Sequence, residues 1–207
     1  MSVYIHGGLR SPIGVLNGQY KHMRPEMLGA QLIDELINRH SILQVDGLFC
    51  GNAVGTGGNI GRLMGLMCNL PNSVPAITVD MQCASALMSI EIAYAHIVSG
   101  IMDSAIAGGI ESSSLQPERV YASGDDREGA YKVAQFTPQD QSPLAMLEGA
   151  ERTIHKHNVT KEDLYPHIIG SHQRASAALD NPYLQSYIMP ITIDGKRCID
   201  ECIRPTM

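Results

Sequence analysis

Several features are scarce or absent in this sequence of 207 residues, and each absence excludes a class of protein. Tryptophan does not occur, aromatic residues make up 5% of the chain, and charged residues make up 17%. Hydrophobic residues nevertheless reach 44%, which excludes a mostly disordered chain. No apolar run approaches the ~18 residues of a membrane helix, and no basic start followed by an apolar stretch is present. We therefore expect neither a membrane span nor a signal peptide.

The cysteines and the charges exclude further classes. The five cysteines include no CxxC pair, and the pair Cys198 and Cys202 has no second pair or suitably spaced histidines to complete a metal site. Free thiols suit a reducing compartment, so we expect a cytoplasmic protein without a metal. The net charge is −6, and no basic stripe is present, which argues against nucleic acid as a main partner.

The first 110 residues alternate between the patterns of strands and helices. We expect strands over residues 3–9, 45–50, 75–81 and 103–107, and helices over residues 25–39, 59–69 and 83–99. This alternation predicts βαβ units and a largely parallel sheet. The helix over residues 83–99 is apolar nearly all round, which predicts that it is buried between layers.

The pattern changes after residue 114. Residues 112–141 resemble a loop, and residues 142–157 form a predicted helix. A second helix begins with a capping box at Thr160 and Asp163 and is expected to be interrupted at Pro166 and Gly170. The alternation over residues 187–193 predicts a strand. We place a domain boundary near residue 115, so that residues 1–115 form a core domain and residues 116–207 a second domain.

The segment around Cys83 carries the strongest chemical signal. A predicted strand turns sharply there, and Cys83 opens the apolar helix. The N-terminus of a helix carries partial positive charge and unpaired N–H groups, which stabilise both a thiolate and the oxyanion of an acyl intermediate. Small residues follow in Ala84-Ser-Ala86, so a substrate could approach the backbone. On these residues alone, a buried cysteine that acts as a small hydrophobic residue is the favoured alternative.

Eight segments together resemble the N-terminal half of a thiolase, in the family's order and over nearly the whole chain. They are residues 10–14, 45–51, 57–62, 75–79, 83–85, 107–112, 171–175 and 200–205. The resemblance implies an α/β fold, with a βαβαβ core, a mixed but mostly parallel sheet and an inserted helical or loop domain. It also implies that Cys83 is the nucleophile that accepts an acyl group from acyl-CoA, and that Met146 lines the acyl pocket. Thiolases use no metal or redox cofactor.

The sequence departs from the family pattern near both of these residues. Ala86 replaces the second glycine of the usual nucleophile motif, and Asp80 stands where many thiolases have asparagine. Beside Met146, the usual preceding histidine is Ala145 and the usual following glycine is Leu147. These differences bear on substrate binding, because an added methyl group near the nucleophile either tightens the packing or crowds the substrate.

The family's second half carries the activating Gly-His-Pro histidine and the acid–base cysteine of a Cys-x-Gly motif, and neither motif occurs in the 207 residues. We therefore expect this chain alone to be inactive. The resemblance implies acyl-CoA and CoA as ligands, and a homodimer, a higher homo-oligomer or a missing C-terminal half as the protein partner. From the charge and the short apolar runs we expect neither nucleic acid nor a membrane as a partner. Three interpretations stay open. They are acyl transfer between thioesters by the complete protein, a non-catalytic remnant or a subunit that needs a partner half, and another condensing enzyme of the ketoacyl synthase superfold. In the first of these, the reaction is thiolytic cleavage of 3-ketoacyl-CoA or the reverse Claisen condensation.

Other polar residues favour structural roles over chemistry. Glu111 is expected to organise the turn after a Gly-Gly pair, and His96 is expected to be a hydrogen-bonded core histidine. The cations Arg119, Arg127 and Lys132 could contact CoA phosphates. A solvated loop is the favoured interpretation, because acidic residues lie between them.

Overall fold

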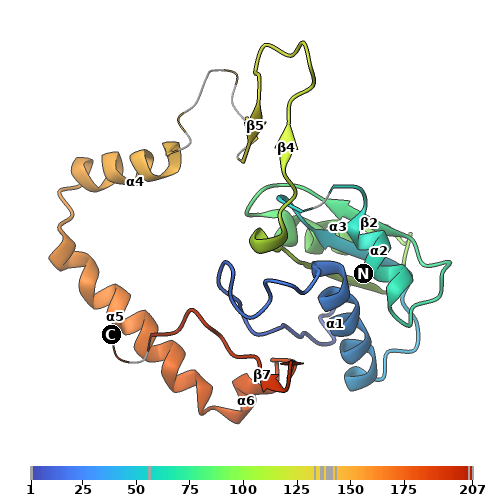
Figure 1. Ribbon diagram of the computed structural model, residues 1–207. Helices are drawn as coiled ribbons and strands as arrows, with labels where there is room; N and C mark the ends of the chain where they lie inside the picture. Colours follow the sequence, from blue (N-terminus) through green and yellow to red (C-terminus); the bar gives the residue numbers. More distant parts are fainter. Residues whose placement is uncertain are drawn as a thin grey trace. The chain divides into compact units, whose positions relative to one another are not determined.

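The computed structural model describes residues 2–55, 57–132, 134–135, 138, 142, 144–204 and 206 (Figure 1). The chain forms two compact units, Met1–Gln116 with Asn181–Cys202, and Pro117–Asp180 with Ile203–Met207. The division after Gln116 lies beside the boundary expected near residue 115, whereas residues 181–202 group with the first unit. Within the described residues, no helix combines the length and the apolar character that crossing a bilayer requires.

A three-stranded parallel sheet, with strand order β2-β1-β3, forms the centre of the first unit. The elements around it are, in chain order, α1 (Pro25–His40), β1 (Gly47–Gly51), α2 (Ile60–Met67), β2 (Ala76–Val79), α3 (Ser85–Val98), β3 (Ala105–Gly109) and the 3₁₀ turn η1 (Ser113–Leu115). In the register of the sheet, Cys50 of β1 pairs with Thr78 of β2 and Gly108 of β3. The predicted α/β class and parallel sheet are confirmed.

The ends of α1 show why the sequence forms this helix. Pro25 occupies the first turn, where its missing N–H costs nothing, and Glu26 places negative charge there. Arg39 and His40 place basic groups in the last turn, and the chain leaves the helix through Ser41 in a left-handed conformation. The predicted helix over residues 25–39 is therefore confirmed.

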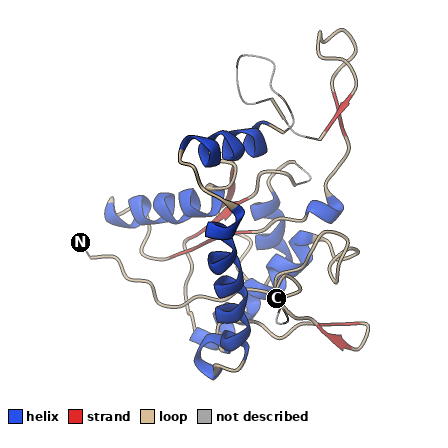
Figure 2. Cartoon of the chain, turned by 90° about the vertical axis from the view of Figure 1, so that its left-hand side faces the viewer, coloured by secondary structure: helices blue, strands red, loops and turns tan. Residues whose placement is uncertain are grey.

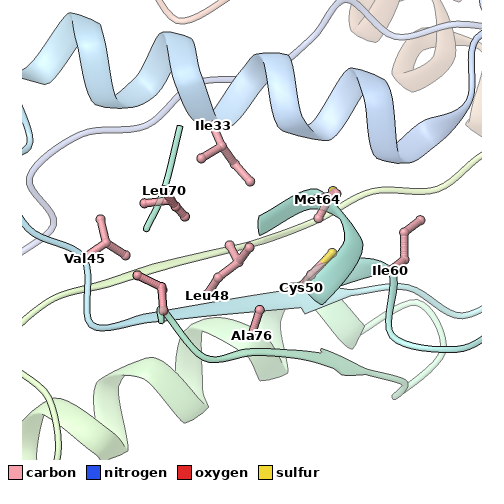
Figure 3. Packing of buried hydrophobic residues seen from close by; sticks show 9 residues of the cluster. Ile33, Val45, Leu48, Cys50, Ile60, Met64, Leu70 and Ala76 are labelled. Carbon is pink, nitrogen blue, oxygen red and sulfur yellow. The ribbon is translucent and has the colours of Figure 1, made fainter. Parts of the chain in front are cut away.

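The main hydrophobic core lies on one face of the sheet, between the sheet and the pair α1 and α2. Figure 3 shows Ile33 of α1 and Met64 of α2 on the same side of β1 as Leu48 and Cys50, with α3 on the opposite side. The buried cluster consists of Ile33, Val45, Leu48, Cys50, Ile60, Met64, Leu70, Val74 and Ala76. Two helices therefore cover one face of the sheet, and α3 covers the other.

The predicted strand over residues 3–9 is wrong. The chain runs as a loop from its N-terminus to α1, drawn in tan in Figure 2, and Tyr4 and Ile5 are 84% and 90% exposed. Its nearest approach to sheet structure is an isolated bridge between Arg10 and Ile188. A strand requires a neighbour for its backbone groups, and no described segment pairs with residues 3–9.

The prediction that α3 is buried on all sides is also wrong for the described residues. The helix meets the sheet through small side chains, since Ser85, Ser89 and Ala93 are its buried residues. Four of its large apolar residues are exposed and form an α3 stripe of Leu87, Ile90, Tyr94 and Val98. The sheet covers only one side of the helix, and within the described residues of the first unit no layer covers the other.

The second unit contains a short hairpin and two helices. Its elements are β4 (Arg119–Val120), β5 (Ala130–Tyr131), α4 (Ala145–Lys156) and α5 (Lys161–Leu179). The capping box at Thr160 and Asp163 is present as predicted, but α5 continues through Pro166 and Gly170. Pro166 lies in the second turn of the helix, where it removes one backbone hydrogen bond without ending the helix.

Residues 181–202 return to the first unit and bind its N-terminal loop. They contain α6 (Pro182–Gln185) and the hairpin strands β6 (Thr192–Ile193) and β7 (Lys196–Arg197), so the strand expected over residues 187–193 is reduced to two residues. Arg10 donates to both carboxylate oxygens of Asp200, over 2.8 and 2.7 Å. Ile13 N donates to the same carboxylate over 2.7 Å, and Glu201 accepts from Val15 N over 2.9 Å.

The pair of Arg10 and Asp200 predicts a pH-dependent contribution to stability. Hydrogen bonds from Arg10 lower the pKa of Asp200, so the pair stabilises the fold above pH ~4, and this is lost as the pH falls through the lowered value. Asp200→Asn is expected to cost ~1–2 kcal/mol at pH ~7, after allowance for screening of the half-exposed Arg10, and nothing in strong acid. Denaturant unfolding across this pH range measures the difference.

The matched control is Asp125→Asn. Asp125 makes the same two-bond contact with Arg127 on the exposed hairpin, and its substitution is expected to leave the unfolding midpoint unchanged. An Asp200→Asn cost that stays the same at every pH would contradict the assignment of this stability to the charge of Asp200.

The α3 stripe predicts that the 207-residue chain self-associates. Four large apolar side chains on one helix face form the kind of patch that soluble monomers rarely expose. We expect light scattering to give a mass above the monomer and a hydrophobic dye to bind. The double variant Leu87→Gln and Ile90→Gln should lower both signals, whereas Leu43→Gln, at an isolated and fully exposed loop position, should not. A monomer that binds no dye would refute this prediction.

Candidate active site

Cys83 lies in the turn between β2 and α3, and its side chain is exposed. The helix begins at Ser85, two residues later than predicted, so Cys83 directly precedes the N-cap residue Ala84. The alternative interpretation of Cys83 as a buried hydrophobic residue is therefore wrong. The helix dipole and the first N–H groups of α3 lie next to the residue that carries the thiol.

The turn before Cys83 contains a residue in an unusual backbone conformation. Gln82 has φ of 52°, a left-handed value that residues other than glycine seldom adopt. Asp80 Oδ1 accepts a hydrogen bond from Gln82 N over 2.9 Å. Ser85 Oγ accepts from Met81 N over 2.8 Å and donates to Gln82 O over 2.6 Å. The sharp turn was expected from the sequence, but its left-handed residue was not, because neither glycine nor asparagine marks that position.

Two glycines let the start of α3 approach the ends of the sheet strands. A Cβ atom at Gly51, the last residue of β1, would lie 2.5 Å from both Ser85 C and Ala86 N. A Cβ atom at Gly109, the last residue of β3, would lie 2.9 Å from the Ala86 methyl group. The extra methyl group at position 86 therefore lies against a glycine of β3.

A buried serine joins the same end of α3 to the sheet. Ser89 is fully buried, and its hydroxyl oxygen lies 2.7 Å from Ala86 O and 2.8 Å from Gly108 O. This contact fixes the helix to β3 one turn after its start. The glycine approach brings the start of α3 to the sheet, and Ser89 adds a contact between the helix and β3 that does not involve the turn.

The other four cysteines are either buried or not placed at the N-terminus of a helix. Burial raises the pKa of Cys50 to about 11, and burial also raises the pKa values of Cys68 and Cys198. These three groups therefore stay as thiols at neutral pH. Cys202 is exposed, but it follows the hairpin β6–β7 and does not begin a helix.

Glu111 binds the glycine-rich turn that follows β1, whereas the sequence predicted that it organises the turn after Gly108-Gly109 in which it lies. Its Oε2 accepts hydrogen bonds from Ala53 N and Val54 N, each over 2.9 Å, and its Oε1 accepts from Asn52 Nδ2 over 3.1 Å. Parallel strands end at the same edge of a sheet, so the turns after β1, β2 and β3 share the edge where Cys83 lies. Asn52 had no distinguishing signal in the sequence.

The remaining candidate residues have separate positions. Met146 lies on α4 in the second unit and is 78% exposed, and its role in an acyl pocket stays a prediction. Arg127 pairs with Asp125, and its guanidinium lies 4.3 Å from the centre of the Tyr121 ring. His96 is partly buried with Nδ1 2.8 Å from Ile92 O, as expected for a core histidine.

A parallel α/β sheet that presents an exposed cysteine at a strand–turn–helix junction defines a class of proteins suited to covalent catalysis through sulfur. A family model described as the N-terminal domain of thiolase matches residues 3–207. The chain belongs to the thiolase family.

The relatives are longer than this chain. The putative acetyl-CoA C-acetyltransferase VraB of Staphylococcus aureus strain MW2 is 33% identical over 193 residues, which cover 90% of this chain and 51% of that protein. The protein of the same name from Staphylococcus haemolyticus strain JCSC1435 is 32% identical, with 96% and 54% covered. A crystal structure of the Bacillus anthracis acetyl-CoA acetyltransferase matches with a TM-score of 0.80 and 25% identity, with 98% and 55% covered. The chain thus spans about half the length of these relatives.

The approach of α3 to β1 predicts that Gly51→Ala disrupts the site. The new methyl group would overlap backbone atoms of Ser85 and Ala86, which cannot rotate away, so the start of α3 must shift. We expect a loss of ~1–3 kcal/mol, measured by denaturant unfolding. Gly108→Ala is the control in β3, because its methyl group meets no atom within 4 Å. Equal losses in the two variants would contradict the specific contact at Gly51.

Proposed function

We propose that Cys83 carries the acyl group in transfer between thioesters. The exposed position of Cys83 at the start of α3 is the observation that supports this proposal. The Cys83 thiolate attacks the carbonyl carbon of an acyl-CoA, and a new C–S bond forms. The tetrahedral oxyanion then collapses, the bond from carbon to the CoA sulfur breaks, and CoA leaves as a thiolate that takes up a proton. This chemistry requires no metal or redox cofactor.

Backbone N–H groups of the turn supply candidate donors for the oxyanion. Ala84 N and Ser85 N already donate within the turn, to Met81 O and Gln82 O. We therefore assign the Cys83 amide as the oxyanion donor in this chain. A donor fixed before the reaction stabilises the charge as it develops without having to reorganise.

The proposed substrate is an acyl-CoA, and the acetyl-CoA named in the relatives' descriptions supports a small acyl group. Both directions, thiolysis of a 3-ketoacyl-CoA and Claisen condensation, pass through the same acyl-cysteine. Met146 stays the proposed lining residue of the acyl pocket.

Residues outside these 207 complete the proposed reaction. No residue of the chain matches the family's activating histidine or second cysteine, and the relatives are about twice as long. We therefore assign acid–base catalysis to a second half, as part of a longer chain or as a partner. A homo-oligomer and a cytoplasmic location are part of the same proposal, and the five free thiols support a reducing compartment.

The test is acetylation of the 207-residue chain by acetyl-CoA, followed by peptide mass spectrometry. We expect one acetyl group on Cys83, no acetylation in Cys83→Ala, and normal acetylation in Cys202→Ala, which removes the other exposed cysteine. Repeated turnover in a thiolysis assay is not expected, because each positioned acid or base contributes ~10²–10⁴ in rate. Acetylation at Cys202, or at no cysteine, would refute the assignment and favour a non-catalytic role.

A further inference from the structure

We propose that Ser85 and Asp80 are positioning residues for the nucleophile, and that they act by holding Gln82 in its left-handed conformation. The purpose of this arrangement rests on the function proposed for Cys83. The arrangement itself rests on the hydrogen bonds of the turn and can be tested without any acyl transfer.

Gln82 needs external support for its conformation. A residue with a Cβ atom is disfavoured at φ of 52°, and it stays there only when its surroundings hold it. Both backbone polar groups of Gln82 are held by side chains of the turn. Its N–H donates to Asp80 Oδ1 over 2.9 Å, and its carbonyl oxygen accepts from Ser85 Oγ over 2.6 Å as well as from Ser85 N over 3.1 Å. Relaxation of Gln82 would break the bonds to both side chains.

The Ser85 hydroxyl is directed toward the turn and does not cap the helix. Ser85 is the first residue of α3, and the N-cap residue Ala84 makes no side-chain cap bond. The buried Ser85 hydroxyl accepts from Met81 N and donates to Gln82 O, so a single oxygen links Met81 to the left-handed residue that follows it. A helix-capping role would have required a bond to an N–H group inside α3.

The planarity of the peptide bond transmits this restraint to Cys83. Gln82 C=O and Cys83 N–H belong to the same peptide unit and point in opposite directions. When Ser85 holds the carbonyl oxygen, it also fixes the direction of the Cys83 amide, which is the proposed oxyanion donor. Ser85 and Asp80 therefore orient the thiol and the amide of Cys83 together.

If Ser85 only stabilised the fold, its removal would affect the reactivity of Cys83 no more than removal of another buried serine. Ser89 is the serine used for this comparison. Both serines are buried on the same helix, but Ser89 links α3 to Gly108 of β3 and makes no bond to the turn. If buried serines matter here only for stability, their removal should affect Cys83 in the same way.

The experiment measures the rate of alkylation of Cys83 by limiting iodoacetamide in the full 207-residue chain, resolved by peptide mass spectrometry. We expect Ser85→Ala to slow labelling about threefold to tenfold at neutral pH, the factor that corresponds to one hydrogen bond. Ser85→Thr, which keeps the hydroxyl, should stay within about twofold of the wild type. Ser89→Ala should lower the thermal midpoint while leaving labelling within about twofold. Unchanged labelling in Ser85→Ala, or equal slowing in Ser89→Ala, would overturn the proposal.

Asp80 provides a second pair of variants at an exposed position, where folding is not at risk. Asp80→Ala removes the acceptor for Gln82 N and should slow labelling, whereas Asp80→Asn keeps an acceptor oxygen and should label at least as fast as the wild type. Wild-type labelling in Asp80→Ala would overturn the role of Asp80. If acetyl-CoA fails to acetylate Cys83 while Ser85→Ala still slows alkylation, only the proposed function is refuted.

Discussion

The close approach of α3 to the sheet at Gly51 and Gly109 is the constraint on which the candidate site depends. Only glycine lets the backbone of β1 come so near to Ser85 and Ala86, because a Cβ atom at Gly51 would overlap backbone atoms. This approach brings the N-terminus of α3 to the carboxyl edge of the sheet. The turn before the helix must then be short and sharp, and Gln82 takes up the resulting strain.

The elements with a strong local signal could be predicted from the sequence. The helix over residues 25–39 has proline and an acid at its start and a basic residue at its end. The apolar strand β1 and the capping box at Thr160 were also predicted from local sequence. The β-favouring stretch that runs directly into an apolar helix made Cys83 a candidate, and the resemblance to thiolases then implied its role as the nucleophile. A structural role for Glu111 was also predicted, but the turn that it binds is the one after β1 and not the one after the two glycines.

Features that depend on distant neighbours could not be predicted. Residues 3–9 have the composition of a strand but no described pairing partner, and α3 is apolar on every side although the sheet covers only one of them. The left-handed Gln82 had no signal, because its conformation comes from bonds to Asp80 and Ser85. Propensity describes a residue in an average environment, and these features are set by particular contacts.

The small residues after Cys83 satisfy two requirements. Ala84, Ser85 and Ala86 leave the thiol accessible, and they also allow the helix to pack on the ends of β1 and β3. Replacement of the family's usual glycine by Ala86 is compatible with both, because its methyl group lies against Gly109, which has no side chain to displace. The space between positions 86 and 109 therefore holds a single methyl group. A larger residue at either position would push the start of α3 away from the sheet, together with the turn that carries Cys83.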